Sequence, residues 1–420
     1  MPFNLINIKR DNYMRWFRSI TLTSQFQPTP SLAKSKVERQ AQSLHECKYL
    51  VKTPGNLSFR ITRTWTTKSL ELNREPVVLC SGLAHNRKIF ALGNDGQMGP
   101  ESKSSLKNKL ALAGLNVFSV ELLRVSKEKI DFDYLLFNHI PAFIDFVRKL
   151  TGHNQVHWVG FSMGSMVIYA YMASARDFML NKLKSISAIC SPFFLHPEQL
   201  PKKLLRTYKW AFFYRSLVNY LNYASILPLK AKKKSLKALG NNIENMNDKV
   251  VEKLFSEILE GIPKGLLDQL KDWAYSEDFR SNPGWAEFKD IEDIEDSNLE
   301  EYINAYKRVL KKTKRRYSYR HNMSFSDIPI LFIAGESDGL APPETVKSAF
   351  DATAHKQHPI DLISTKGEGY TSKQRGNKVF LKFEKLGHLD AVLSEKVQGH
   401  IEQFLINHST ENAPANICLF

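Results

Sequence analysis

One serine in this 420-residue chain lies in a setting that suits a nucleophile. Ser162 is the centre of a Gly-Phe-Ser-Met-Gly pentapeptide at 160–164, after the strand-forming run 156–159 and before the apolar helical run 166–173. A strand, a sharp turn and a helix in this order expose a serine hydroxyl at a helix N-terminus, where the helix dipole favours negative charge. A tight glycine turn with a solvated serine is the alternative. The flanking runs favour the nucleophile.

Two other residues complete the chemistry that a serine nucleophile needs. The serine must lose its proton to a base, and an acid must orient that base. Asp338 follows the strand-like run 328–335, and His388 follows the strand-like run 379–383. Serine, acid and histidine in this chain order predict a catalytic triad of Ser162, Asp338 and His388.

Two nearby carboxylates have alternative interpretations. Glu336 is the other candidate for the acid, but it lies closer to the end of the strand than Asp338. Asp390, two positions after the histidine, either supports the histidine or is a solvated or helix-capping residue. We prefer Asp338 as the acid and leave Asp390 open.

Ester cleavage also needs two backbone N–H donors for the oxygen that becomes negative. We expect them at Met163, directly after the nucleophile, and at Leu83, in the turn after the strand-like run 76–80. His85, in the same turn, is a substrate contact or a structural histidine. The remaining histidines lack the paired spacing of metal ligands, and the first strand has no glycine-rich phosphate loop. We therefore predict no metal and no cofactor.

The composition restricts the partners and the compartment. Lys and Arg number 59 against 43 Asp and Glu, a net charge of +16 that favours anionic surfaces such as phospholipid or nucleic acid. The basic run 307–320 has no nucleic-acid-binding signature, so we expect no nucleic acid. No apolar run is long enough for a membrane span, and no secretory signal is evident. We expect a cytoplasmic protein with peripheral contact to anionic membrane.

The cysteines indicate a reducing compartment. They are far apart and show no paired motif, and two of them lie in apolar strand-like runs. The four are Cys47, Cys80, Cys190 and Cys418. We expect free buried thiols at 80 and 190 and no disulfide framework.

Strand-like and helical runs alternate through most of the chain, which predicts a parallel sheet covered by helices. An antiparallel hairpin at a sheet edge is expected at 46–65, and a loop or hairpin at 354–378. Between 193 and 326 no strand pattern occurs. The expected strands are 76–80, 117–122, 156–161, 183–190, 328–335 and 379–383, and the expected helices are 107–113, 134–150, 166–173, 343–352 and 394–407.

These segments resemble the α/β-hydrolase superfamily, and more closely its lipase and polyhydroxyalkanoate-synthase branch. The run Ser-Gly-Leu-Ala-His-Asn-Arg at 81–87 is similar to the His-Gly-Leu-x-x-Asn-Arg oxyanion segment of that branch. The similarity covers roughly residues 46–408. Further similar segments are the helix 132–152 before the nucleophile, the cap segments 262–269, 272–274 and 279–281, and the histidine motif 387–390.

The chain departs from that branch at two positions. Ser81 replaces the usual histidine, which we expect to soften the oxyanion turn. Ser162 stands where polyester synthases carry a cysteine, and this argues against polyester synthesis.

The resemblance implies an α/β-hydrolase fold, with a mostly parallel central sheet flanked by helices and a helical cap inserted after strand 6. The expected parts are an N-terminal extension (1–44), the first part of the core (45–193), the cap or lid (194–326), the second part of the core (327–410) and a tail (411–420). The aromatic stretch 204–223 suits a lid for acyl chains or a membrane contact, or else a helix packed on the sheet. A weak amphipathic anchor or a loosely packed arm is expected at 13–22.

The function that follows is hydrolysis of carboxylic esters through an acyl-enzyme, with an acyl ester or lipid as substrate. An acyltransferase that uses the same triad is the first alternative. A non-catalytic binding protein with this fold, or a membrane-surface effector, is the alternative from another class.

Overall fold

The computed structural model describes most of the chain outside a few segments. The described residues are 43–52, 58–100, 102–122, 130–174, 180–194, 226–238, 240–276, 278–282, 316–323, 326–354 and 369–410. The expected anchor at 13–22, the lid stretch at 204–223, most of the basic run 307–320 and the tail lie outside them. The expected division into domains stays a prediction.

The described residues form one central sheet of nine strands, in the order β1-β2-β4-β3-β5-β6-β7-β9-β8. The pairs from β4 through β3, β5, β6 and β7 to β9 are parallel. Every residue of β3, β4, β5 and β7 is buried, as expected for strands covered on both faces. The bounds are β1 His45–Lys52, β2 Ser58–Trp65, β3 Val77–Cys80, β4 Val117–Val120, β5 Val156–Phe161, β6 Leu183–Ile189, β7 Ile330–Gly335, β8 Tyr370–Arg375 and β9 Lys378–Phe383.

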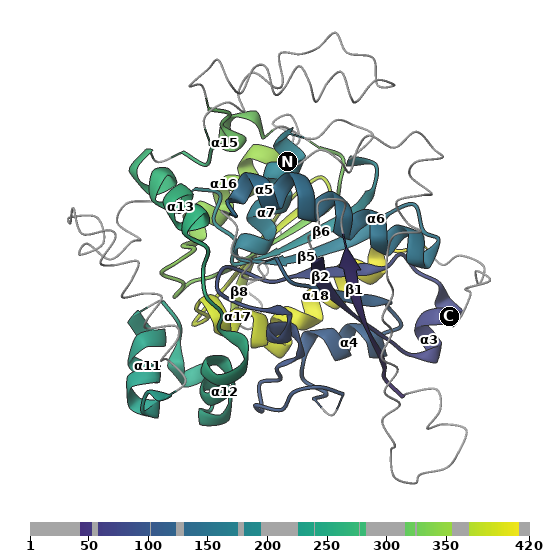
Figure 1. The fold of residues 1–420 in the computed structure, drawn as a ribbon, viewed down its shortest axis with the longest axis horizontal. Helices are drawn as coiled ribbons and strands as arrows, with labels where there is room; N and C mark the ends of the chain where they lie inside the picture. The colour runs from purple at the N-terminus through teal and green to yellow at the C-terminus, as the bar shows by residue number, and fades with distance from the viewer. Residues whose placement is uncertain are drawn as a thin grey trace.

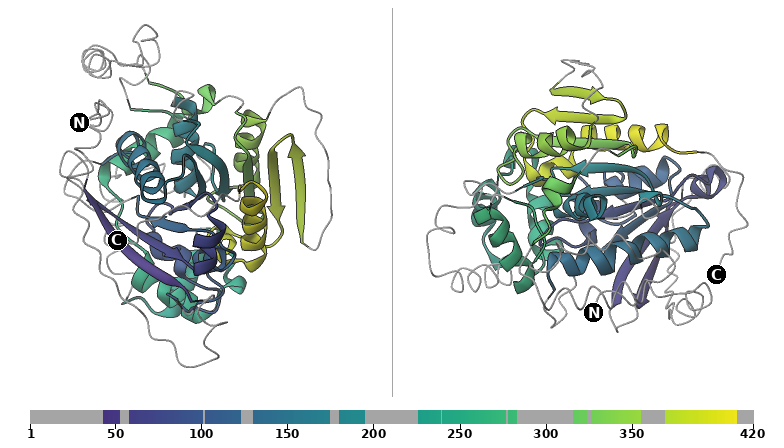
Figure 2. Two further views of the ribbon diagram at one scale, coloured as in Figure 1. Left: turned by 90° about the vertical axis from the view of Figure 1, so that its right-hand side faces the viewer. Right: turned by 90° about the horizontal axis from the view of Figure 1, so that it is seen from above.

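Antiparallel strands form both edges of the sheet (Figure 2). β1 pairs with β2, which confirms the predicted hairpin at 46–65. At the other edge β8 pairs with β9 through a turn at Gly376, whose φ of 56° suits glycine. The end of the polar stretch 354–378 therefore forms a strand, β8. Of the two expected forms, loop or hairpin, the structure has a hairpin of β8 and β9 before the histidine.

Helices cover the two faces of the sheet (Figure 1). Helices α6 and α7 lie on one face, and α4 and α18 lie on the other. The predicted helix at 134–150 is interrupted by a π-helical turn at Leu135–His139, because Pro141 has no N–H for a regular helical bond. The helices of the core are α3 Thr67–Leu72, α4 Leu106–Leu112, α5 Phe132–Tyr134, α6 Ile140–Thr151, α7 Met163–Ser174, α16 Pro343–Thr353, α17 His388–Leu393 and α18 Glu395–Asn407, with a 3-10 turn at Arg87–Ala91.

The segment between residues 194 and 326, called the insertion below, forms short helices joined by turns and loops where it is described, with isolated bridges. Its helices gather on one side of the sheet, at the left in Figure 1. They are α11 Leu229–Ala238, α12 Asp248–Lys253, α13 Lys264–Ser276 and α15 Tyr319–Asn322, with a 3-10 turn at Ile243–Asn245 and a π-helical turn at Leu254–Ile258. Among the described ranges, none of the helices combines the length and apolarity that crossing a bilayer requires.

The three cysteines in the described ranges, Cys47, Cys80 and Cys190, are buried free thiols. Burial raises the pKa of the Cys80 and Cys190 thiols, so both stay protonated at neutral pH. They behave as small apolar side chains of the core, as expected from their sequence context.

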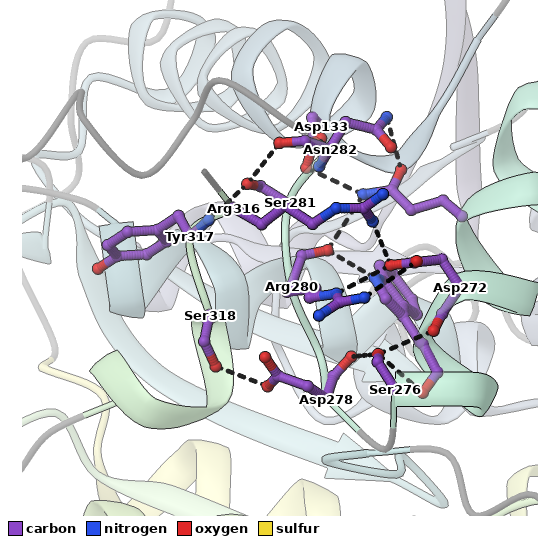
Figure 3. A network of polar contacts seen from close by, with 12 residues as sticks. Asp133, Asp272, Ser276, Asp278, Arg280, Ser281, Asn282, Arg316, Tyr317 and Ser318 are labelled. Atoms are coloured by element: carbon purple, nitrogen blue, oxygen red, sulfur yellow. Dashed lines mark hydrogen bonds and ion pairs between the residues drawn. The ribbon is translucent and has the colours of Figure 1, made fainter. Parts of the chain in front are cut away.

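A buried carboxyl group of the core fastens the insertion. Asp133 receives hydrogen bonds from the Tyr319 hydroxyl (2.6 Å), the Gln269 amide (3.1 Å) and the backbone N–H of Asn282 (2.7 Å). In Figure 3 it lies at the edge of a polar network made otherwise by the insertion. Within that network Asp272 holds Arg280 through two bonds of 2.9 and 3.1 Å and also contacts Arg316. The Asp133 side chain of α5 is thus one of the points at which the insertion is anchored to the core.

This anchor should make stability depend on pH. Burial, and then the charge of nearby Asp131, raise the pKa of Asp133 to about 7, against about 3.9 in an unfolded chain. A group whose pKa is higher in the folded state favours folding when protonated. Its contribution is complete below about pH 4 and is lost as the pH rises towards 7.

Replacing Asp133 by asparagine removes this titration. We expect the stability of Asp133→Asn relative to wild type to rise between pH 5 and pH 8. Denaturant unfolding midpoints measured across that range test this. A stability difference that stays constant with pH would show that Asp133 does not titrate there.

Candidate active site

Ser162 lies on a sharp turn between β5 and α7. Its φ is 53°, in the left-handed region that L-residues with side chains rarely adopt, at a cost of roughly 1–3 kcal/mol. Backbone bonds hold the turn: the N–H of Ser162 donates to the Ile189 carbonyl (2.8 Å), and its carbonyl accepts from the Ser191 hydroxyl (2.6 Å). The serine therefore stands above the end of the sheet, at the start of α7.

Close backbone packing explains the glycines on either side. A Cβ atom on Gly164 would lie 2.1 Å from the carbonyl oxygen of Cys80, and one on Gly160 would lie 2.5 Å from the carbonyl oxygen of Gly164. The Trp158 indole also donates to that Gly164 carbonyl at 2.9 Å. Helix and strands approach one another too closely here for any side chain. The pentapeptide thus forms the predicted elbow.

The structure brings the three residues of the predicted triad together. The His388 Nε2 atom lies 2.9 Å from the Ser162 hydroxyl oxygen, and its Nδ1 atom lies 2.8 Å from a carboxylate oxygen of Asp338. The other carboxylate oxygen of Asp338 accepts from the backbone N–H groups of Leu340 (2.9 Å) and Ala341 (2.8 Å). The side chain of Asp338 is fully buried, so these three donors substitute for water around its charge. The geometry allows proton movement from serine to imidazole.

The two alternative carboxylates lie elsewhere. Glu336 is exposed and pairs with Lys382 at 3.0 Å, so it makes no contact with the histidine. Asp390 caps the helix that begins at His388: its carboxylate accepts from the backbone N–H of Gly387 at 2.9 Å. Burial raises the pKa of Asp390, and hydrogen bonds from Gly387, Asn245, Asn242 and its own backbone act in the opposite direction. Helix capping was one of the alternatives left open by the sequence.

The expected oxyanion donors border the serine. Met163 is the first residue of α7, and Leu83 follows Gly82, whose added Cβ would lie 2.9 Å from the Ser162 Cβ. The hydroxyl of Ser81 donates to the carbonyl of His85 at 2.9 Å and closes the turn. Ser81 therefore bonds across this turn, and the softening that we expected from its replacing a histidine stays a prediction. The donor roles of Leu83 and Met163 stay a prediction.

His85 lies beside the triad. Its ring contacts Phe161 edge-on at 5.8 Å between centroids, and Phe161 in turn contacts His388 at 5.0 Å. Neither ring nitrogen of His85 has a hydrogen-bond partner among the described residues. Burial and the nearby His388 lower the pKa of His85 to about 4, so the ring is neutral at pH 7. Its two expected roles, as a substrate contact or as a structural histidine, stay predictions.

One group in the described ranges offers metal-ligand atoms at close range. Single ligand atoms of Cys190, Asp338 and His388 lie within 4.8 Å of one another. A metal there would compete for the His388 nitrogen and the Asp338 carboxylate that already bond to each other. The Cys190 thiol would also have to lose its proton against a raised pKa. The donor set therefore fits proton transfer better than metal binding.

The insertion braces the oxyanion turn. The amide of Asn86 donates to the Glu257 carbonyl (2.9 Å) and to the Glu260 side chain (3.0 Å). Backbone bonds join Asn86 to Ile258 (3.0 Å) and Glu260 to Ala84 (2.9 Å). Sequence reasoning missed this contact, because its two partners are more than 170 residues apart.

The sequence also left unassigned the short helix α17 that begins at His388. Its signal was Asp390 three residues after Gly387, the spacing of a capping carboxylate.

With the fold and the site described, comparison with known proteins identifies the family. A family model of the alpha/beta hydrolase fold matches residues 75–360, which is more than half of the chain. The chain therefore belongs to the α/β-hydrolase family. This confirms the superfamily and the fold class that the sequence motifs implied. A search of curated proteins found no match.

Solved structures with a similar fold include an esterase from Rhodococcus sp. (13% identity, 87% of this chain and 98% of that chain, TM-score 0.49). A monoacylglycerol lipase from Paleococcus ferrophilus has 13% identity, 80% and 97% coverage and a TM-score of 0.42. A bromoperoxidase from Bacillus anthracis has 14% identity, 86% and 99% coverage and a TM-score of 0.47. The family assignment rests on the family model alone.

The elbow should tolerate no side chain at Gly164. We expect Gly164→Ala to lose about 3 kcal/mol of stability, the upper end of the usual cost of overpacking, because the added methyl would force the Cys80 strand and α7 apart. Gly152→Ala is the matched control: its φ is 75° and nothing lies within 4 Å of the added methyl. That variant should lose only about 1–2 kcal/mol, the cost of a left-handed residue. Equal losses in chemical denaturation would contradict the close approach.

Proposed function

We propose that this protein is a serine hydrolase that cleaves carboxylic esters. The observation that carries the proposal is the hydrogen-bonded series Ser162–His388–Asp338, with contacts of 2.9 and 2.8 Å. Membership of the α/β-hydrolase family supports the proposal. So does the position of the three residues, since the nucleophile, the acid and the histidine each follow the carboxyl end of a parallel strand.

The proposed reaction has two halves that use the same groups. The Ser162 oxygen attacks the ester carbonyl carbon while His388 takes the serine proton at Nε2. The imidazolium then gives that proton to the leaving alcohol, and an acyl-serine remains. Water then attacks the acyl carbon while His388 takes its proton. The bond to the Ser162 oxygen breaks, the imidazolium returns the proton to that oxygen, and the acid leaves. Asp338 keeps the Nδ1 proton in place and stabilises the imidazolium in both halves.

The tetrahedral intermediates carry a negative oxygen. In this proposal the backbone N–H groups of Leu83 and Met163 receive it, at the start of α7 where the helix dipole adds favourable potential. The Ser81 bond to His85 keeps the Leu83 turn closed. Loss of one such donor typically lowers the rate about 10²–10³-fold.

The resemblance to lipases leads us to propose an acyl or lipid ester as substrate, with peripheral contact to anionic membrane as a further part of the proposal. The basic charge of the chain supports the membrane contact.

A fluorophosphonate probe tests the central proposal. It reacts only with a serine that a base activates. We expect one adduct in the intact mass of the wild-type protein and none in Ser162→Ala. Ester hydrolysis by Ser162→Ala should fall by at least about 10³-fold. A series of p-nitrophenyl esters of increasing chain length then defines the acyl preference.

Two controls make the result specific. Glu336→Gln should keep labelling and turnover, since its carboxylate pairs with Lys382 and not with the histidine. Asp338→Asn should lower turnover about 10⁴-fold. A folded wild-type protein that neither labels nor hydrolyses any ester of the series, with and without anionic vesicles, would overturn the proposal. Transfer to an added alcohol in preference to water would identify an acyltransferase.

A further inference from the structure

The helix that carries the candidate base begins at that base. The first N–H groups of a helix have no partner inside the helix and need one from outside. The residue before α17 is Gly387, which has no side chain to cap it. The Asp390 carboxylate accepts a hydrogen bond from the backbone N–H of Gly387. The next two backbone N–H groups donate to the insertion. His388 donates to the carbonyl of Gly240 at 3.2 Å, and Leu389 donates to the side-chain oxygen of Asn241 at 2.7 Å.

The loop before α17 is held from the same side. Lys385 has a φ of 58°, an unfavourable left-handed conformation for a residue with a side chain. Its carbonyl accepts from the amides of both Asn242 and Asn245, each at 2.8 Å. The carboxylate of Asp390 accepts from the backbone of Asn242 (3.2 Å) and from the amide of Asn245 (2.7 Å).

Backbone packing places the same segment against the acid loop. A Cβ on Gly240 would lie 2.1 Å from the backbone nitrogen of Gly339, the residue after Asp338. A Cβ on Gly387 would lie 2.5 Å from the carbonyl oxygen of Gly240. Gly240 therefore sits between the loop of the acid and the loop of the histidine.

Internal bonds keep this segment in its own shape. The backbone N–H and the side-chain amide of Asn241 both donate to the carbonyl of Leu236, at 3.2 and 2.9 Å, at the end of α11. Asn241 is buried, so its side-chain oxygen has a fixed direction towards Leu389. The segment therefore has a turn structure of its own, held by hydrogen bonds to the end of α11.

We propose that the segment 240–245 of the insertion positions His388 for proton transfer, with Asn241, Asn242 and Asn245 as positioning residues. This inference rests on the proposed function and adds to it: part of the active-site support belongs to the insertion. Proton transfer depends on the distance between the serine oxygen and the imidazole, and a displacement of 1 Å can cost about 10²-fold in rate. The positioning residues do not touch the reacting atoms.

The test compares three alanine variants of the insertion. Asn241→Ala removes the partner of Leu389, and Asn245→Ala removes two donors to the histidine loop. Asn247→Ala is the matched control, because Asn247 is exposed like Asn245 and caps α12 through a bond to Val250 at 2.9 Å. Its amide donates to the carbonyl of Asn94 at 2.7 Å and not to the histidine loop. All three lose a capping or bridging amide of the same insertion.

We expect kcat for an activated ester to fall about 10- to 100-fold in Asn241→Ala and about 3- to 10-fold in Asn245→Ala, with KM changed less than about twofold. Asn247→Ala should keep both constants. Asn241→Asp retains an oxygen acceptor for Leu389 and should recover part of the kcat lost in Asn241→Ala. A general loss of structure would affect the control as well and would move KM.

A second measurement separates this inference from the proposed function. The hydrogen bond from His388 Nδ1 to Asp338 is expected to give a downfield proton resonance, which is assigned by its absence in His388→Ala. It should persist in wild type and Asn247→Ala and weaken in Asn241→Ala, even if the protein cleaves no ester. Unchanged kcat and an unchanged resonance in Asn241→Ala and Asn245→Ala would overturn the positioning role. If the protein has no activity but shows the expected resonance pattern, the proposed function is contradicted and the positioning role is supported.

Discussion

The left-handed turn at Ser162 is the constraint on which the rest of the site depends. It places the serine oxygen above the sheet only because three chain segments approach within van der Waals contact at Gly82, Gly160 and Gly164. The bonds to Ile189 and Ser191 then offset the strain of the turn. A fully buried parallel sheet can impose such a turn, since its neighbouring strands leave the backbone no room to relax.

The candidate base His388 and the turn at 81–87 are supported differently from the candidate nucleophile Ser162. Ser162 is held by the core alone, whereas the turn around Asn86 and the helix at His388 both bond to residues 240–260 of the insertion. This stretch therefore bonds directly to two parts of the candidate active site.

The sequence predicted the core of the site because each signal is local. A serine between glycines, flanked by a strand and a helix, needs no distant partner to be recognised, and Asp338 and His388 were found by their places after strands. The supporting contacts could not be predicted. Asn242 lies 148 residues from Asp390, in a polar stretch without periodicity. Pro141 explains the π-helical turn before α6. The apolar pattern predicted a helix there but could not show which turn would be π-helical.

The place of the insertion also matters while the chain is being synthesised. Strands β5 and β6 and the serine turn are complete before β7, which pairs with β6, has been made. Until the insertion and β7 emerge, β6 is an apolar edge strand with unpaired backbone groups, a state that invites aggregation. The candidate triad can therefore form only after β9 and α17 have been made, because α17 begins with its histidine.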